Sequence, residues 1–204
     1  MAHYVLESEA QSLYTPLSEN EIRYISLHPG NVDDPLQCNF IYGLALPDRV
    51  PLMYSALSYC WGNELASQPI TLNGHPIQIS KNLAAALRNL RRASGSKHMT
   101  LWADALCINQ SDLEEKSVQV PRMSFIYENA SQVICWPGEK VGQLEIACEK
   151  IREIVTLLPQ QGLAGTPSVT PLAQLTPVVH SRISDKDWLA LTHLFTLSWW
   201  SRVW

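Results

Sequence analysis

The stretch LWADALCINQ, Leu101–Gln110, decides the fold that we expect for this chain. It begins with apolar residues, as a buried strand does, but it carries Asp104 in its middle and ends on the polar Asn109 and Gln110. In open parallel sheets, ligands bind in a crevice at the carboxyl ends of the strands, where polar residues follow each apolar strand. We therefore predict a strand from Thr100 to about Cys107, with its polar exit at such a crevice.

Two other segments have the composition of buried strands. They read YSALSYCWG (54–62) and SQVICWPG (131–138), and each is closed by a glycine. A short apolar run bounded by turn residues is typical of a strand buried on both faces. Helical patterns separate the three predicted strands, and this alternation indicates a parallel central sheet flanked by helices.

Two β-hairpins are expected in addition. Asn73-Gly74 lies between the β-prone halves of PITLNGHPIQIS (69–80), and Asn-Gly in that position is the strongest short-range signal for a tight hairpin. Nearer the N-terminus, EIRYISLHPG (21–30) and LQCNFIYGLAL (36–46) are strand candidates joined by turn-like residues. They predict an N-terminal hairpin.

Three further helices are predicted, two from their caps and one from the periodicity of its apolar residues. Ser80 can cap a helix that follows the inserted hairpin, and Ser184 can cap another near the C-terminus. The segment LEIACEKIREIVTLL (144–158) has the spacing of apolar residues that one face of a helix requires.

The segment after Gln110 predicts an interrupted helix. Ser111 and Glu114 form an S-x-x-E capping box, so a helix should begin at Asp112. Pro121 falls inside the apolar periodicity and would remove one helical hydrogen bond, at a cost of about 3 kcal/mol. We expect a kink there, or two helices that meet at Val120.

The length of 204 residues suits a single domain with a proper core. Residues 1–20 show no sustained periodicity, and we expect them to be loosely attached. Residues 21–204 would form the domain. Within it, residues 159–177 are rich in Pro, Gly, Gln, Ser and Thr and predict a loop or insertion.

Composition excludes several function classes. The chain holds 15 Lys and Arg against 19 Asp and Glu, a formal charge of −4, and its basic residues are scattered apart from Arg91 and Arg92. We therefore expect no nucleic-acid partner. The sequence has no run of about 20 apolar residues and no signal peptide, which predicts a cytoplasmic protein without a membrane span.

Five cysteines without a C-x-x-C pair predict neither a disulfide framework nor a metal site. Cys107 lies in an apolar stretch, and none of the six histidines forms a recognisable partner motif for a thiol nucleophile. We expect no metal and no certain cofactor.

Asp104 is the most informative candidate residue. Its carboxylate, near the crevice, could accept hydrogen bonds from a ribose, a loop amide or an arginine. Alternatively, it is a structural carboxylate that pairs with a backbone donor or with Arg202, because a buried charge requires a partner. Asn109 and Gln110 could likewise bind a ligand or fasten the turn before Ser111 by local hydrogen bonds.

Four residues at the end of the first predicted strand share this ambiguity. The Trp61 indole could stack on a planar ring, and Gly62 permits close backbone approach. Both could instead serve core packing or the turn. Ser58 and Tyr59 are crevice candidates with the same two interpretations.

The C-terminal region is rich in tryptophan. Trp188, Trp199, Trp200 and Trp204 could clamp the sheet as a hydrophobic cluster. They could also form a self-association surface together with Arg202, because aromatic residues and arginine are common interface hot spots.

Several of these motifs together resemble the fungal heterokaryon incompatibility (HET) domain. They are YSALSYCWG, ISKNLAAALRNLR, the stretch LWADALCINQSDLEEKSVQVPRMSFIYENASQVICWPGE, and the terminal WWSRVW. The resemblance begins near Ile22 and spans most of the chain. Two features depart from the family pattern: Pro121 lies inside a family helix, and Trp136-Pro137-Gly138 replaces the usual W-L-G.

The resemblance implies a role in programmed cell death after fungal non-self recognition, a form of innate immunity. HET domains are regarded as distant relatives of Toll/interleukin-1 receptor (TIR) domains, which implies a TIR-like, flavodoxin-like fold. Our leading hypothesis is an effector or signalling module that forms a homo-oligomer on activation, under a possible upstream sensor protein.

The TIR kinship also implies a second hypothesis, a NAD glycohydrolase. Enzymatic TIR domains cleave NAD with a glutamate in a tryptophan-containing helix, and HET proteins typically continue RVW with a few residues and then Q-E. This chain ends at Trp204, so it would be truncated before that glutamate and weak or inactive on NAD. No catalytic residue is assigned within it.

Overall fold

The structure is a computed structural model that describes residues 13–31, 33–44, 53–62, 67–138, 142–157 and 183–201. Its contacts divide the chain into two compact units, Met1–Glu139 and Lys140–Val203. The expected domain 21–204 includes both, and each is described here by itself. The predicted loop 159–177 and residues 1–12 lie outside the described part of the chain.

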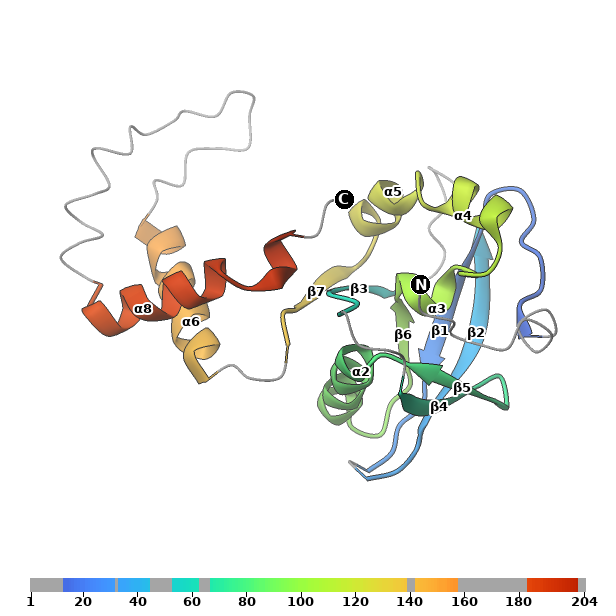
Figure 1. Cartoon of the computed structure of the whole chain (residues 1–204), viewed down its shortest axis with the longest axis horizontal. Helices are drawn as coiled ribbons and strands as arrows, with labels where there is room; N and C mark the ends of the chain where they lie inside the picture. Colours follow the sequence, from blue (N-terminus) through green and yellow to red (C-terminus); the bar gives the residue numbers. More distant parts are fainter. Residues whose placement is uncertain are drawn as a thin grey trace. The chain divides into compact units, whose positions relative to one another are not determined.

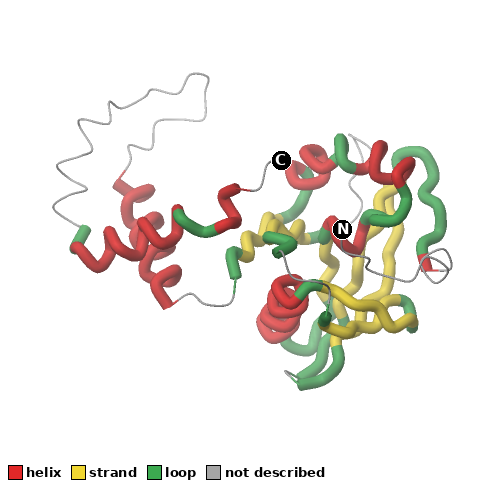
Figure 2. Tube along the Cα trace, in the orientation of Figure 1, coloured by secondary structure: helices red, strands yellow, loops and turns green. Residues whose placement is uncertain are grey.

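The first unit is built on a mixed seven-stranded sheet with the order β5-β4-β2-β1-β6-β3-β7. Figure 2 shows that all the described strands belong to this unit. The strands are β1 (Glu21–Leu27), β2 (Leu36–Leu44), β3 (Ser55–Tyr59), β4 (Gln68–Leu72), β5 (His75–Ile79), β6 (Met99–Trp102) and β7 (Gln132–Trp136).

The predicted parallel core of three strands is confirmed. β3 pairs in parallel with β6 on one side, where Ser55 faces Leu101, and with β7 on the other, where Tyr59 faces Trp136. All five residues of β3 are buried. The carboxyl ends of these three strands therefore point to the same edge of the sheet.

The sheet as a whole is mixed because β1 runs antiparallel between β2 and β6. Both predicted hairpins are confirmed, β1–β2 and β4–β5, and both join the same sheet through the parallel pair β2–β4. Asn73 and Gly74 have positive φ angles of 50° and 81°, as a type I′ hairpin turn requires.

Helices flank this sheet. They are α2 (Lys81–Ser94), α3 (Asp104–Cys107), α4 (Leu113–Gln119) and α5 (Met123–Glu128). In Figure 1, α2 lies on one side of the strands, whereas α4 and α5 lie on another. The Ser80 hydroxyl accepts a hydrogen bond from the Leu83 amide, which confirms the predicted cap of α2.

The predicted strand from Thr100 to Cys107 is wrong in its second half. β6 ends at Trp102, and the chain then turns into the short helix α3, where the Ala103 carbonyl accepts hydrogen bonds from the amides of Leu106 and Cys107. Side-chain donors from distant parts of the chain bind the carbonyls at the end of this turn. Tyr14 donates to Leu106 O and Arg23 donates to Cys107 O, so the buried turn leaves neither group without a partner.

The next helix begins one residue later than predicted. α4 starts at Leu113, and its cap is Asp112 rather than Ser111, because the Asp112 carboxylate accepts from the Glu114 and Glu115 amides. The predicted break near Pro121 is confirmed: α4 ends at Gln119 and α5 begins at Met123.

The expectation that β7 is buried is also wrong. β7 is the last strand of the sheet, with β3 as its one described neighbour, and its residues are partly or largely exposed. An edge strand leaves one side of its backbone and much of its side-chain surface uncovered.

The described part of the second unit is helical, with α6 (Gly142–Leu157), α8 (Asp185–Phe195) and a short 3₁₀ helix, η1 (Ser198–Ser201). Its small core joins Ala147 of α6 with Ile183, Ala190, Leu191 and Leu194. Ser184 caps α8 in a reciprocal capping box with Asp187, which confirms the predicted cap. Among the described helices of both units, none is long and apolar enough to cross a lipid bilayer.

Candidate functional site

The candidate site is the edge of the sheet where β6, β3 and β7 end, which we call the rim. It consists of Cys60, Trp61, Gly62, Asn82, Asp104 and Trp136. β3 continues three residues beyond the point where Ala56 pairs with Trp102, the last residue of β6. The segment after β3 and the turn after β6 are thus brought together, as their parallel direction predicts.

The contact between Trp61 and Asp104 joins these two exits. The Trp61 indole N–H lies 3.1 Å from both Oδ1 and Oδ2 of Asp104, and Oδ1 also accepts the Ala105 amide at 2.8 Å. Asp104 is 3% exposed, whereas Trp61 is partly buried. A carboxylate removed from water requires such donors, so the indole helps to stabilise it in place.

Gly62 follows Trp61 with a φ of 76°. This is a left-handed conformation that favours glycine, and it lets the chain turn away directly after the rim. The two crevice candidates Trp61 and Gly62 therefore lie where the sequence predicts them, at the exit of β3.

Asn82 is a rim residue that the sequence reasoning missed. Its Nδ2 donates to Cys60 O at 2.7 Å, and its Oδ1 accepts from the Trp136 indole N–H at 2.9 Å. One amide thus ties the first turn of α2 to the exits of both β3 and β7. Asn82 lies two residues after the Ser80 cap, at the N-terminus of α2, which faces the end of β3. This position is the sequence signal that could have identified Asn82 as a rim residue.

Asn109 and Gln110 make local hydrogen bonds in the structure. Asn109 Oδ1 accepts from the Ser111 amide at 3.2 Å. Gln110 Nε2 donates to the carbonyls of Asp104 and Ile108 at 2.9 and 3.2 Å. Both side chains fasten the turn between α3 and α4, and Gln110 reaches back to the backbone of Asp104.

Ser58 and Tyr59 lie inside β3 and are buried, with exposed fractions of 2% and 0%. The structure therefore places both side chains in the core beneath the rim, rather than on the open surface of the rim.

Cys107 is a buried thiol. Its Sγ accepts a hydrogen bond from the Ala103 amide, and burial raises its pKa to about 12. A thiol nucleophile must ionise near neutral pH, so this environment works against a catalytic role. None of the five cysteines, each of which lies in the described part of the chain, forms a disulfide bond.

Arg23 helps to fix the turn that follows β6. Its side chain is fully buried and binds both carboxylate oxygens of Glu115, at 2.8 and 3.2 Å, while the rings of Tyr14 and Phe40 lie 4.8 and 5.2 Å from its guanidinium carbon. Burial alone would lower the pKa of Arg23, but the hydrogen bond and charge of Glu115 raise it above its usual value. Glu115 also accepts the Asn109 amide, so this ion pair fixes the turn that carries Asp104.

Some of the predicted assembly residues lie within the part of the chain that the structure describes and others do not. Trp200 is 50% exposed, its indole donates to Leu194 O at 2.8 Å, and its ring lies against Phe195 and Trp199. Arg202 and Trp204 lie outside the described residues, so the suggested pair between Asp104 and Arg202 stays a prediction.

Comparison with known proteins identifies the family. The family described as heterokaryon incompatibility protein (HET) matches residues 54–204, which contain the rim and both units' described helices. The chain is also 34% identical over 145 residues to heterokaryon incompatibility protein 6, OR allele, of Neurospora crassa, a match that covers 65% of this chain. The match covers 21% of that relative, so the chain spans about a fifth of its length.

No solved structure matches the chain. The family assignment therefore rests on the sequence match, which covers more than half of the chain and includes every residue of the rim. This protein belongs to the heterokaryon incompatibility (HET) family.

Proposed function

We propose that this HET domain acts in heterokaryon incompatibility as a cell-death effector or signalling module of fungal non-self recognition. The observation that carries this proposal is the family match over residues 54–204, together with the similarity to an incompatibility protein of Neurospora crassa. The domain would act in the cytoplasm, triggered by an upstream sensor protein.

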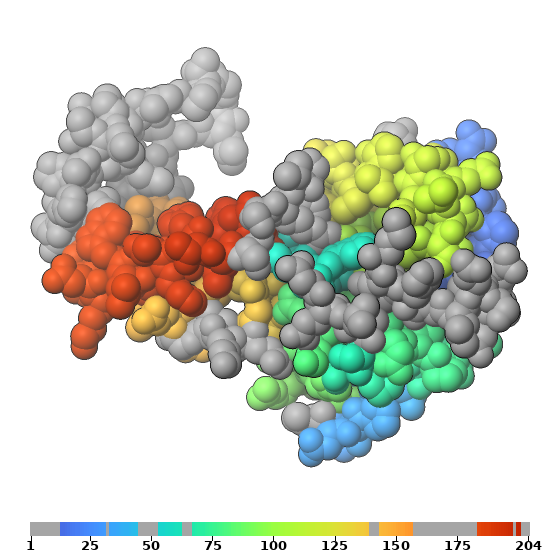
Figure 3. Space-filling model, viewed as in Figure 1, coloured from blue at the N-terminus to red at the C-terminus, as the bar shows by residue number. Residues whose placement is uncertain are grey.

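The proposal includes activation by self-association through the second unit. α8 forms much of the visible surface of this unit in Figure 3. Leu189 and Phe195 of α8 are both 59% exposed, Trp188 of α8 is 38% exposed and Trp200 of η1 is 50% exposed. Large exposed aromatic side chains are typical of interface hot spots.

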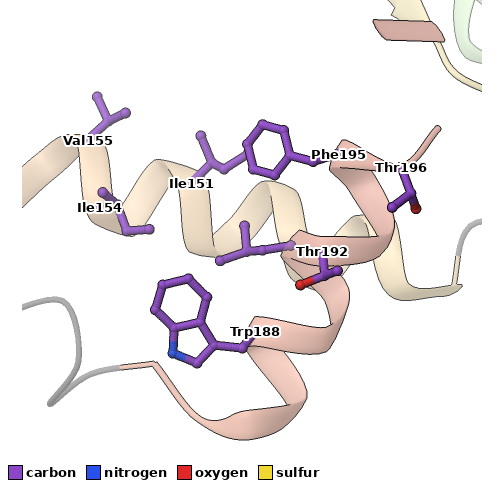
Figure 4. A pocket seen from close by; sticks show the side chains of 8 residues that line it. Ile151, Ile154, Val155, Trp188, Thr192, Phe195 and Thr196 are labelled. Atoms are coloured by element: carbon purple, nitrogen blue, oxygen red, sulfur yellow. The ribbon is translucent and has the colours of Figure 1, made fainter. Parts of the chain in front are cut away.

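A groove between α6 and α8 adds to this surface. It has a volume of about 520 Å³ and is lined almost entirely by apolar side chains, among them Ile151, Val155, Trp188 and Phe195. Figure 4 shows the lining side chains of both helices, with Phe195 of α8 beside Ile151 of α6. We infer that a second copy of this chain packs against the groove, because burial of its apolar lining would favour association.

Expression in a filamentous fungus tests the proposal. Induced expression of the chain should kill the cells, and Phe195→Asp should abolish killing by placing a charge in the apolar surface. Val118→Asp is the matched control, because Val118 is an apolar residue of α4 that is 45% exposed but lies in the first unit. Survival of cells that express the folded wild-type chain would contradict the effector role. Unchanged killing by Phe195→Asp would contradict the self-association surface.

The rim favours a second candidate function, NAD glycohydrolysis. Trp61 and Asp104 meet at the carboxyl ends of parallel strands, where open α/β sheets bind ligands. A planar indole can stack on nicotinamide, and cleavage of the glycosidic bond would need a carboxylate that stabilises an oxocarbenium-like transition state. NAD would then be the substrate.

Nicotinamide release from NAD tests this second candidate. The assay uses a chain extended through the expected Q-E, at concentrations that promote assembly. Activity that is lost when that glutamate becomes glutamine would support the enzyme. Absence of nicotinamide release from the assembled, extended chain would exclude this candidate and leave a non-enzymatic signalling domain.

A further inference from the structure

A second site of different chemistry lies at the far end of α2 from the rim. α2 begins beside Cys60, where Asn82 binds, and ends at Ser94, with Gly95 as its C-cap. There a groove of about 600 Å³ is lined by Arg88, Arg91 and Arg92 of α2, by Pro29, Gly30 and Asn31 of the loop after β1, and by Gly95 and Ser96. The volume is in the range of small-molecule sites.

Two of these arginines have no acidic partner among the residues that the structure describes. Arg92 is exposed and Arg88 is partly buried, and within the described part of the chain neither forms an ion pair. Arg88 Nη2 donates a hydrogen bond of 3.3 Å to the neutral amide oxygen of Gln68. Arg88 and Arg92 lie four positions apart on one helix. Like charges at this spacing destabilise a helix unless an anion lies between them.

Arg91 supplies a fixed guanidinium at the same groove. It is 2% exposed, and its two terminal nitrogens donate to Pro35 O at 3.1 Å and Asp34 O at 2.9 Å. Gly30 lies directly against it, since an added Cβ would be 3.2 Å from Arg91 Nη1. The same Cβ would lie 3.2 Å from Asp34 Oδ2, so the glycine lets the loop pack closely against this guanidinium.

One carboxylate is close to this groove without lining it. Asp34 Oδ2 accepts hydrogen bonds from the backbone and side-chain nitrogens of Asn31, at 2.7 and 3.1 Å. Among the described residues, three arginines and no carboxylate line the groove, on a chain whose formal net charge is −4.

Compensation of the helix dipole explains only part of this cluster. Basic residues in the last turn stabilise the C-terminus of a helix, and Arg91 and Arg92 lie in that turn of α2. Arg88 lies one turn earlier, where the dipole gives little benefit, yet it lines the same groove.

We propose that the Arg88/Arg92 groove binds a small molecule that carries a diphosphate group. Guanidinium groups bind phosphate oxygens in a bidentate manner, and two of them at this spacing suit two linked phosphates. Five of the eight residues that line the groove are polar or charged, and the guanidinium groups among them would recognise the phosphates. This site is independent of the rim and of self-association.

Calorimetric titration of the full chain with pyrophosphate, at constant ionic strength, tests the proposal. We expect one binding site per chain. Arg92→Gln should weaken binding about tenfold, because it removes a charge-assisted contact, and Arg88→Gln/Arg92→Gln should weaken it further. Lys81→Gln removes one positive charge from the opposite end of α2 and should leave the affinity unchanged.

Three results would overturn the proposal: no binding of pyrophosphate, equal weakening by Lys81→Gln, or equal affinity for sulfate. Arg92 is exposed, so its substitution should leave the fold intact, which a thermal melt of the variant checks. Parallel titrations with ADP distinguish the source of the diphosphate. Tighter binding of ADP than of pyrophosphate would identify a nucleotide, and the reverse would identify a free diphosphate.

Discussion

Arg23 of β1 and Glu115 of α4 form a buried bidentate ion pair, with oxygen–nitrogen distances of 2.8 and 3.2 Å. Arg23 is fully buried, and the side chain of Glu115 is 8% exposed. The same guanidinium donates to the carbonyls of Thr15 and Cys107. One side chain therefore connects the N-terminal segment, the sheet and the turn after β6.

Replacing Arg23 with methionine should lower the free energy of unfolding by about 3–5 kcal/mol, because Glu115 would remain as a buried charge without its partner. Urea denaturation followed by circular dichroism measures this. Lys97→Met is the control, since Lys97 is exposed and its loss should change stability by less than about 0.5 kcal/mol. A loss below about 1 kcal/mol for Arg23→Met would contradict the role of the pair.

Cys107 should resist alkylation in the folded chain. Burial raises its pKa from 9.0 to about 12, so the thiol stays protonated at pH 8 and is also inaccessible. Iodoacetamide should label Cys107 only after denaturation, whereas the exposed Cys135 should react in the folded protein, as peptide mass spectrometry would show.

The same pKa shift predicts a pH dependence of stability. The folded state disfavours the thiolate, so the contribution of Cys107 is complete below pH 9.0 and is lost as the pH rises toward about 12. Cys107→Ala should show a shallower loss of stability over this window. An identical alkaline profile for variant and wild type would contradict this assignment.

Ser184→Ala should destabilise α8 by about 1 kcal/mol, because the Asp187 amide loses its capping acceptor. Hydrogen bonds from the Ser184 amide and hydroxyl lower the pKa of Asp187 below its usual 3.8. The contribution of Asp187 is therefore complete above pH 3.8 and is lost as the pH falls further. Amide exchange of Asp185–Phe195 measures the effect, and Thr192→Ala, in the interior of the same helix, is the control.

Asn82→Ala should loosen β7 selectively. The substitution removes the acceptor for the Trp136 indole and the donor to Cys60 O, so amide exchange in Gln132–Trp136 should accelerate while β1 and β2 stay protected. Asn89→Ala is the matched control on the same helix, since Asn89 Nδ2 donates to the local carbonyl of Ala85. Equal acceleration in both variants would contradict the bridging role of Asn82.

Features encoded by local sequence were predictable. The Asn73-Gly74 hairpin, the Ser80 and Ser184 caps and the break near Pro121 all depend on a few adjacent residues, and the structure confirms them. The parallel direction of β3, β6 and β7 followed from the alternation of strands and helices.

Features that depend on distant contacts were not predictable. The turn at α3 continues an apolar run that resembles a strand, but Arg23 and Tyr14, far away in sequence, bind its carbonyls. The exposure of β7 follows from its place at the edge of the sheet, which its apolar sequence does not encode. Asn82 was missed because its two partners come from different strands.

A double-mutant cycle between Trp61 and Asp104 tests most directly whether the segments that follow β3 and β6 meet at one rim. The variants are Trp61→Phe, Asp104→Asn and the pair together, with unfolding free energies from urea denaturation. A hydrogen bond to a buried carboxylate predicts a coupling energy of about 1 kcal/mol or more. Additive effects, within about 0.3 kcal/mol, would contradict the rim.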